Sequence, residues 1–515
     1  MFRIRTNSSH TQISTPFSHR SRTTGQKLSG SSFMAETVNP HRLQIAIVGA
    51  GIAGLSAAIA LAHHPAVDVH VYERASELRE IGASIALGPN GMRTLERLGV
   101  HEALDDDVAF RNKSGFPMIY RHWQTDETVS VDRHVGPVLP LHRTARFYRA
   151  HLQECLLRHV DPTKIHLGKA FRSVTSRKDT KRLVITFTDG TTSLPADIIL
   201  GADGIHSAVR TYFVPESSTA RTGWVAFRSV FPIEHVQHIE GLPDEASHIW
   251  GPDRTLFVSK LGRGLFTVVG SWQGRPDGSE SGQVTATTTA ATSEDDVYKN
   301  AVWDQEGDVE FLKSLYKDWG PVGKGIVDAT PWTRVYPNAA AGKLDTWILG
   351  GDVAADASAN GRDVWTVSNV GEGGFKGRVT LAGDAAHAHG GAFAAGGSLA
   401  IDDAWAFSAA IMHVFLPAPV SQPPTDENIT KALRLYESTR KAHTDRVMDV
   451  VHAGNKKKAA RAGGGEKVTE TDEQLRERMK SRAEVAWIHE HDVVKEFDRA
   501  VKETRNGPRN TVEQS

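Results

Sequence analysis

The stretch IAIVGAGIAGLSAAIAL, residues 45–61, constrains the fold of this chain more than any other. An apolar strand leads into Gly49, Gly51 and Gly54, and an apolar helix follows, which is the G-x-G-x-x-G pattern of a dinucleotide-binding turn. The first glycine permits the tight turn, the second lets the backbone approach a pyrophosphate, and the third allows the helix to pack on the strand. Glu73 ends the next apolar strand, about 20 residues further on, where it can accept a hydrogen bond from a ribose hydroxyl. A tightly packed turn without a ligand would leave Glu73 unexplained, so we predict dinucleotide binding.

A second run of small residues, GDAAHAHGGAFAAGGSLAIDDA, occupies residues 383–404. It follows an apolar strand-like segment, RVTLA, and leads into an apolar helix-like segment. Flexible linkers are usually polar and rich in glycine and serine, which this run is not. A strand, a tight turn and a helix start together present backbone N–H groups to an anion. We therefore predict a ligand site containing Asp384, with a close helix contact or a linker as the alternatives.

The composition excludes several classes of function. The chain has 515 residues and a formal net charge of −1, so nothing indicates a nucleic-acid partner. Its most apolar stretch, residues 46–62, is short and glycine-rich, which argues against stable membrane insertion. Cys155 is the single cysteine, so neither an intrachain disulfide nor a cysteine-rich metal site can form.

Residues 1–33 carry arginine, serine and threonine but no acidic side chain, as mitochondrial transit peptides do. A disordered leader, or an extension ahead of a true start at Met34, would have the same composition. We expect a cytoplasmic protein, with a mitochondrial location as the alternative if this segment is a transit peptide.

Four motifs, in this order, resemble those of the class A flavoprotein aromatic monooxygenases, in particular the fungal salicylate-hydroxylase type. They are IVGAGIAGLSAAIAL (47–61), YERASELREIGASIALGPNGMRTLERLG (72–99), DIILGADGIHSAVR (197–210) and RVTLAGDAAHA (378–388). The resemblance runs from about residue 41 to about residue 445. The segment WIHEHDVVKEF (487–497) also resembles the ends of those fungal proteins.

The resemblance implies an α/β fold: a FAD-binding Rossmann-like domain of the GR2 type, with an inserted antiparallel-sheet substrate domain and a helical C-terminal segment. The β-like runs between about residues 222 and 345 agree with such an insertion. The expected boundaries are a disordered leader at 1–40, FAD-binding domain at 41–220 and 376–445, a mainly substrate-binding sheet at 221–375, and a helical tail at 446–515. Surface loops are expected at 274–298 and 350–374, and a solvated linker at 456–467.

The resemblance also supplies roles for matching positions. Glu73 would hold the adenosine ribose of FAD, with Arg74 next to it, and Asp384 would bind the ribityl chain. Gly396 and Gly397 would lie beside the isoalloxazine ring.

Three further cofactor positions follow from the same motifs. Ala83, in GAS, would line the flavin. Arg149 matches the arginine of the family's H-R-x-x-L pattern, for which His142–Arg143 is a rival match. Asp203 belongs to a D-G pair linked to FAD and to the nicotinamide cofactor.

The sequence departs from the family pattern at two places. Gly391 stands where relatives usually have a proline, and Ser259–Lys260 stand where many have a Tyr-Pro pair that reaches the phenol. The strand TGWVAFRSV keeps the family's arginine, so Arg228 is our candidate catalytic residue on the substrate side. The alternative is an arginine on the solvated face of a strand.

Two pairs of histidines could be metal ligands, namely His387 with His389 and His489 with His491. Neither lies in an H-E-x-x-H pattern, and no third ligand is spaced to complete a site. We therefore predict no metal.

The function implied by the resemblance is hydroxylation of a small phenolic or aromatic acid substrate that is salicylate-like. FAD, reduced by NADPH or NADH as co-substrate, would react with O2 to give the flavin C4a-hydroperoxide that attacks the ring. No second dinucleotide-binding turn is evident, which fits transient use of NAD(P)H, and a homodimer is left open. Alternatives are a FAD-dependent epoxidase or monooxygenase of a non-phenolic natural product, an NAD-dependent dehydrogenase, or a flavin-binding protein with lost activity.

Overall fold

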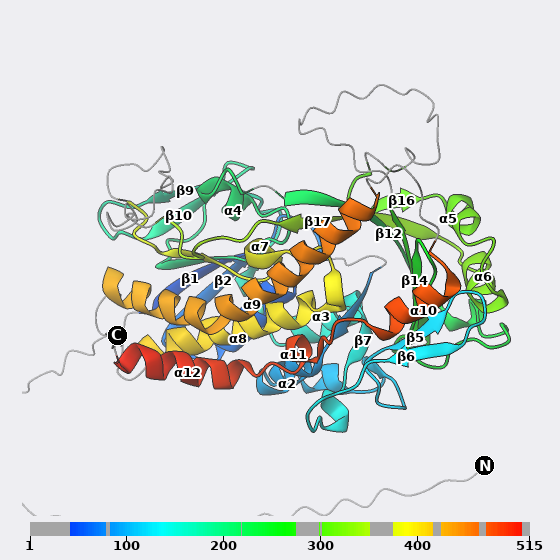
Figure 1. Cartoon of the computed structure of the whole chain (residues 1–515). Helices are drawn as coiled ribbons and strands as arrows, with labels where there is room; N and C mark the ends of the chain where they lie inside the picture. Colours follow the sequence, from blue (N-terminus) through cyan, green and yellow to red (C-terminus); the bar gives the residue numbers. More distant parts are fainter. Residues whose placement is uncertain are drawn as a thin grey trace, which may run out of the picture. The chain divides into compact units, whose positions relative to one another are not determined.

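The computed structural model describes most of the chain beyond the leader. The described residues are 42–78, 83–217, 219–273, 298, 301–350, 374–415, 424–462 and 470–506. The predicted leader and nearly all of the two predicted surface loops lie outside these ranges. The fold class agrees with the prediction: an α/β region built on a parallel sheet is combined with a largely antiparallel sheet and C-terminal helices (Figure 1).

The parallel sheet has five strands in the order β18-β11-β1-β2-β8, and all of its pairings are parallel. The strands are β1 (Leu43–Val48), β2 (Val67–Tyr72), β8 (Ile165–His166), β11 (Ile198–Gly201) and β18 (Val379–Leu381). Helix α1 (Ile52–Ala62) is buried along nearly its whole length, which explains why its sequence is apolar on every side. Strand β18 comes from far along the chain, as expected for a domain built from two separate segments.

The second sheet has eight strands in the order β16-β17-β12-β15-β14-β13-β5-β6. Its strands are β5 (Ile119–His122), β6 (Thr128–Val131), β12 (Thr219–Pro232), β13 (Ser247–Trp250), β14 (Thr255–Lys260), β15 (Leu265–Gln273), β16 (Gln305–Gly307) and β17 (Thr333–Ala341). One pairing, between β13 and β5, is parallel. Strands β5 and β6 come from within residues 41–220, so the first segment contributes to both sheets, which sequence reasoning did not foresee.

Strand β12 shows how this sheet separates its two faces. Val225 and Phe227 are buried in the core formed with α5 (Val309–Leu315) and α6 (Pro321–Asp328). Trp224 and Arg228 point to the opposite face, because successive side chains of a strand alternate.

Smaller elements connect the two regions. A three-stranded sheet orders β3 (Ser84–Leu87), β7 (Ala145–Tyr148) and β4 (Phe110–Arg111) as β3-β7-β4, and a separate pair joins β9 (Phe171–Ser176) to β10 (Leu183–Phe187). The short helices nearby are α2 (Pro89–Arg97), α3 (Arg149–Leu157), α4 (Ala208–Phe213) and α7 (Asp384–His387). The hydroxyl of Thr267 donates to that of Ser84 at 2.9 Å, which ties the three-stranded sheet to β15.

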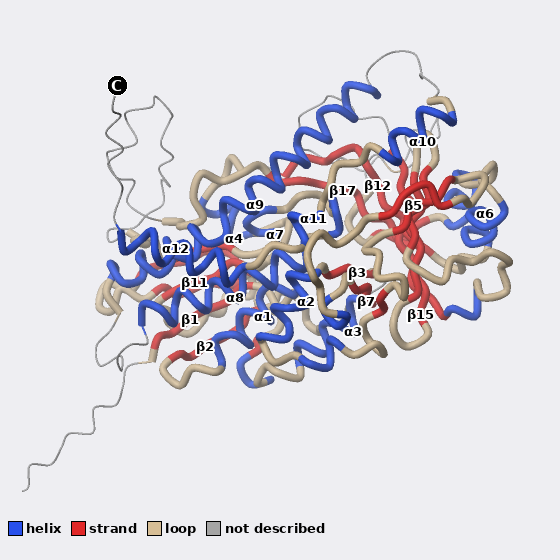
Figure 2. The backbone as a smooth tube through the Cα atoms, turned by 60° about the horizontal axis from the view of Figure 1, so that its bottom comes forward, coloured by secondary structure: helices blue, strands red, loops and turns tan. Residues whose placement is uncertain are grey.

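The C-terminal part is helical, as predicted. It comprises α8 (Gly396–Phe415), α9 (Asp426–Ala462), α10 (Asp472–Lys480), α11 (Ala486–His489) and α12 (Val493–Asn506). Figure 2 shows α9 running alongside α8 and on toward β17 and β12, with α12 against the same helices. No helix in the described ranges combines the length and apolarity needed to span a membrane.

The predicted linker at 456–467 is wrong over residues 456–462, which continue helix α9; the remainder lies outside the described residues. Alanine, lysine and arginine are strong helix formers, so this segment extends the helix up to the following glycines.

The glycines of the β1–α1 turn give a stability prediction. A Cβ atom on Gly54 would lie 2.0 Å from the carbonyl oxygen of Gly49, whereas a Cβ on Gly51 would meet nothing within 4 Å. We expect Gly54→Ala to lower the free energy of unfolding by about 3 kcal/mol, because the backbone it meets cannot move aside. Gly51→Ala is the matched control and should change that free energy by less than about 0.5 kcal/mol. Urea unfolding of the ligand-free protein measures both, and equal losses would contradict the steric assignment.

Candidate functional site

A cavity of about 2640 Å³ lies among the parallel-sheet region, the eight-stranded sheet and residues 470–490, which are called the C-terminal segment below. Of the predicted site residues, it is lined by Gly51, Arg74, Ala83, Arg149, Arg228, Asp384, Gly396 and Gly397. Gly49, Gly54, Glu73 and Asp203 do not line it. Most of the site residues predicted from the sequence therefore line the same cavity.

The β1–α1 turn has the geometry that its glycines predict. Gly49 has a φ of +105°, and a Cβ there would lie 2.4 Å from the carbonyl oxygen of Ala202. Gly49 and Gly54 thus allow close backbone packing, while Gly51 faces the cavity with open space around it. An anion can approach the backbone at Gly51 and the start of α1.

Glu73 and Arg74 follow β2 directly. The carboxylate of Glu73 accepts hydrogen bonds from the backbone N–H groups of Ala50 (2.7 Å) and Ala75 (2.9 Å). The Glu73 side chain therefore stabilises the backbone of the glycine turn and does not line the cavity, whereas Arg74 does.

Asp203 has a local structural role. Its carboxylate accepts hydrogen bonds from the hydroxyl of Ser207 (2.5 Å) and the backbone N–H of Val209 (3.1 Å) at the start of α4. Burial raises the pKa of Asp203. The neighbouring Gly204, rather than Asp203, lines the cavity.

Arg149 and Ala83 meet where β7 passes β3. The backbone N–H of Arg149 donates to the carbonyl of Ala83 at 3.0 Å, and both residues line the cavity. His142 bonds to Glu96 instead, and neither His142 nor Arg143 lines the cavity. The geometry favours Arg149 over the rival match.

The second glycine run forms a turn between β18 and α7 followed by a loop before α8. Asp384 is exposed at the start of α7 and lines the cavity, as do Gly396 and Gly397. A Cβ on Gly397 would lie 2.7 Å from the side chain of Ile85, so a larger residue would collide with β3. Phe393 and Ala394 have φ values of +59° and +51°, a left-handed conformation that non-glycine residues rarely adopt.

A buried polar network supports this run. Asp403 on α8 accepts hydrogen bonds from the backbone N–H of Gly383 (2.8 Å), from Nε2 of His387 (2.6 Å) and from Nε of Arg440 on α9 (2.8 Å). His387 belongs to one of the two histidine pairs that could suggest a metal site, and its ring bonds to the carboxylate of Asp403. In the described part of the chain, no group of three His, Cys, Asp or Glu side chains could hold a metal ion.

Asp402 extends this network toward α2. Its carboxylate accepts hydrogen bonds from the amide of Asn90 (2.9 Å) and the hydroxyl of Thr94 (2.7 Å). Sequence reasoning did not single out Asp402 or Asp403, the two acids of the segment IDDA. Two adjacent carboxylates in an apolar helix indicate that each has a buried polar partner, because an unpaired buried charge is costly.

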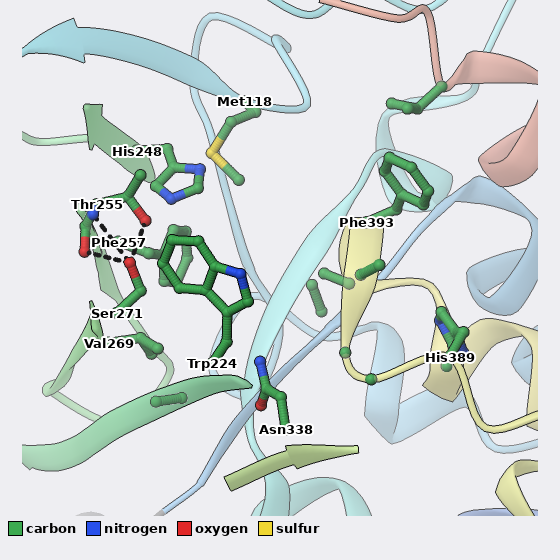
Figure 3. Close-up of a pocket in the computed structure, with 18 of the residues that line it drawn as sticks. Met118, Trp224, His248, Thr255, Phe257, Val269, Ser271, Asn338, His389 and Phe393 are labelled. Atoms are coloured by element: carbon green, nitrogen blue, oxygen red, sulfur yellow. Dashed lines mark hydrogen bonds between the residues drawn. The ribbon is translucent and has the colours of Figure 1, made fainter. Parts of the chain in front are cut away.

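The substrate-side wall is one face of the eight-stranded sheet. Figure 3 shows Trp224 near Met118 and His248, with Phe393 across from them; Phe393 belongs to the loop between α7 and α8, residues 388–395, called here the glycine-rich loop. Arg228 lies over the ring of Tyr336, with its Cζ 5.3 Å from the ring centroid.

The charge of Arg228 is partly desolvated. Burial lowers its pKa, and the neighbouring Arg149 adds to the effect. Ser259 and Lys260, at the position of the family's Tyr-Pro pair, do not line the cavity.

The C-terminal segment closes another side of the cavity. Arg482 bonds to Asp132 at 2.5 Å and lies over the ring of Tyr120, with its Cζ 3.2 Å from the centroid. Glu490 accepts backbone hydrogen bonds from Val135 and Gly136. Sequence reasoning expected a helical tail and missed its contribution to the site; the resemblance of residues 487–497 to the ends of fungal relatives was the available signal.

Comparison with known proteins identifies the family. Residues 42–300 and 349–450 match the family described as FAD binding domain. The chain belongs to this family. The match includes every predicted cofactor position and ends before the segment at 470–490.

The relatives of this FAD-binding chain are monooxygenases. It is 27% identical over 424 residues to the 6-hydroxynicotinate 3-monooxygenase of Pseudomonas fluorescens, which covers 79% of this chain and 90% of that protein. It is 25% identical to a salicylate hydroxylase of Pseudomonas putida, over 79% of this chain and 83% of that protein. A solved salicylate hydroxylase substrate complex has the same fold, with a TM-score of 0.63 at 20% identity over 90% of this chain and 98% of that one. The protein is a FAD-dependent monooxygenase of the class A type, as its motifs predicted.

The cavity of this monooxygenase fits FAD. It is continuous from the open space at Gly51 to the exposed carboxylate of Asp384 and the two glycines that begin α8. Backbone N–H groups suit a pyrophosphate, and a carboxylate suits sugar or ribityl hydroxyls.

Three histidines near the C-terminal segment give a pH prediction. Burial lowers the pKa of His489 to about 4 and that of His491 to about 3, and burial together with His491 lowers the pKa of His443 to about 2. The rings of His443 and His491 stack with their centroids 3.8 Å apart. In the unfolded chain these groups take up protons near pH 6.5, so the stability they contribute is lost as the pH falls from 6.5 toward 4.

We expect the free energy of unfolding to fall between pH 7 and pH 5, and His491→Phe to reduce that slope by up to about 1.4 kcal/mol per pH unit. Urea unfolding at several pH values measures the slope. His63→Gln, at an exposed position, is the control. An unchanged slope in His491→Phe would contradict the assignment.

Proposed function

We propose that the protein uses NAD(P)H and O2 to hydroxylate a small phenolic aromatic compound of the salicylate kind. The observation that carries the proposal is one continuous cavity, which is lined by the β1–α1 glycine turn, by the carboxylate of Asp384 and by a sheet face bearing Trp224 and Arg228. The named relatives act on hydroxylated aromatic acids, which supports the same substrate class.

On the cofactor side, we assign the pyrophosphate of FAD to the backbone at Gly51 and to Arg74. Asp384 accepts hydrogen bonds from the ribityl hydroxyls, and Gly396 and Gly397 leave room for the ring system. Glu73 acts indirectly by holding the backbone of the turn in place. Asp203 acts indirectly by fixing the start of α4, so that Gly204 lies at the cavity.

On the substrate side, the ring lies against Trp224 and below the glycine-rich loop. Bound FAD supplies the reduction of O2 and the transfer of one oxygen atom to the substrate. A phenolate is a better nucleophile than a phenol, and the partly desolvated cation of Arg228 stabilises the phenolate oxygen. The surrounding walls, including the C-terminal segment, exclude water from the reacting ring.

The direct test follows NAD(P)H oxidation by the FAD-loaded protein with salicylate and a panel of phenols, with peroxide trapped in parallel. We expect one phenolic compound to stimulate oxidation at least tenfold with little peroxide and a hydroxylated product. Oxidation stimulated only by non-phenolic compounds would contradict the phenolic substrate, and a protein that never retains FAD would contradict the whole assignment.

Arg228 provides a second test. We expect Arg228→Ala to lower kcat/KM for the phenolic substrate about 100-fold, because positioned acid–base and charge effects contribute about that much. Arg221→Ala, on the same strand but away from the cavity, is the control. If Arg228→Ala left substrate-dependent turnover and substrate affinity intact, the role would be withdrawn.

A further inference from the structure

Arg146 is a deeply buried cation on the wall of the cavity. It lies on β7, is 2% exposed and lines the cavity. In the three-stranded sheet, Arg146 pairs with Ala86 of β3. Ser84 lies two residues before Ala86 on the same face of β3, and its hydroxyl accepts a hydrogen bond from Thr267 of β15. This face of β7 is therefore turned toward the substrate sheet.

The hydrogen bonds of Arg146 do not compensate its charge. Its two terminal nitrogens donate to the backbone carbonyls of Pro117 and Thr144, and its Nε has no partner. No carboxylate among the described residues forms an ion pair with it. Burial lowers its pKa to about 10, so the guanidinium stays charged at neutral pH.

The nearest acidic groups are engaged elsewhere. The acidic groups that act on Arg146, each by raising its pKa, are Tyr120, Asp132 and Glu245. Asp132 already accepts from Tyr120 (2.9 Å) and Arg482 (2.5 Å), and Glu245 accepts from the backbone of Ser114 at 2.6 Å. A buried arginine without an acidic partner is costly unless a ligand supplies the negative charge.

We propose that Arg146 binds the carboxylate of the substrate, so that the substrate class is an aromatic acid anion and not a neutral phenol. The inference rests on the proposed function and deepens it. Planar guanidinium and carboxylate groups can form two parallel hydrogen bonds, which would orient the ring as well as hold it. Arg146 then recognises the acid, while Arg228 is left for the phenol oxygen.

The test compares ligands that differ only in charge, namely the three hydroxybenzoates and their hydroxybenzamides. Dissociation constants are measured on the FAD-loaded protein from changes in the flavin absorbance, with no NAD(P)H present. The variants are Arg146→Gln, Arg146→Lys to retain the charge, and Arg254→Gln as a matched control. Arg254 also lines the cavity but is paired with Asp253 at 2.6 Å.

We expect the wild-type protein to bind one acid at least about tenfold more tightly than its amide, and Arg146→Gln to weaken that acid about 30-fold but its amide less than about threefold. Arg146→Lys should recover part of the loss, which a role in folding alone would not produce. Arg254→Gln should change neither constant by more than about twofold.

Equal losses for acid and amide, or a wild-type protein that binds no aromatic acid, would overturn the inference. Preferred hydroxylation of neutral phenols would overturn it while the proposed function stands. Arg146-dependent binding of an acid without any stimulated turnover would support the inference and contradict the proposed function.

Discussion

The buried carboxylate of Asp403 is the interaction on which the rest of the site depends. It is fully inaccessible and accepts from three elements at once: the turn after β18, helix α7 and helix α9. Burial alone would raise its pKa, but its interactions with His387 and Arg440 outweigh that effect and hold the pKa below its usual value. An ionised group in this position fixes the turn that presents Asp384 to the cavity. Arg440 is equally buried, so neither partner is stable without the other.

The two glycine-rich segments could be interpreted from sequence because their requirements are local. Gly49 and Gly54 are needed where backbone approaches backbone, and both lie in the same short turn of the chain. Asp384 and Gly397 likewise follow from a strand, a turn and a helix that are continuous in the chain. Asp203 was also predicted from a local motif, but its carboxylate accepts hydrogen bonds at the start of α4, from donors only four and six residues ahead, and does not line the cavity.

What sequence reasoning missed depends on contacts between distant residues. Asp402 bonds to Asn90, which lies 312 positions away, and no spacing rule connects the two. Strands β5 and β6 join the substrate sheet through the parallel pairing of β5 with β13, although they belong to the first segment of the chain. Arg146 was overlooked for a related reason: its neighbour Arg149 matched a motif, whereas burial, which distinguishes Arg146, is visible only in the folded protein.

The segment at residues 470–490 has a consequence for how the protein is made. Ribosomal synthesis proceeds from the N-terminus, so both sheets and the glycine-rich loop can emerge before residues 470–490, which form one wall of the cavity, have been made. Val485, Trp487 and Ile488 pack against the loop that contains the left-handed Phe393. The cavity can therefore be completed only after residues 470–490 have left the ribosome, and a nascent chain that ends before them would leave this side of the cavity open.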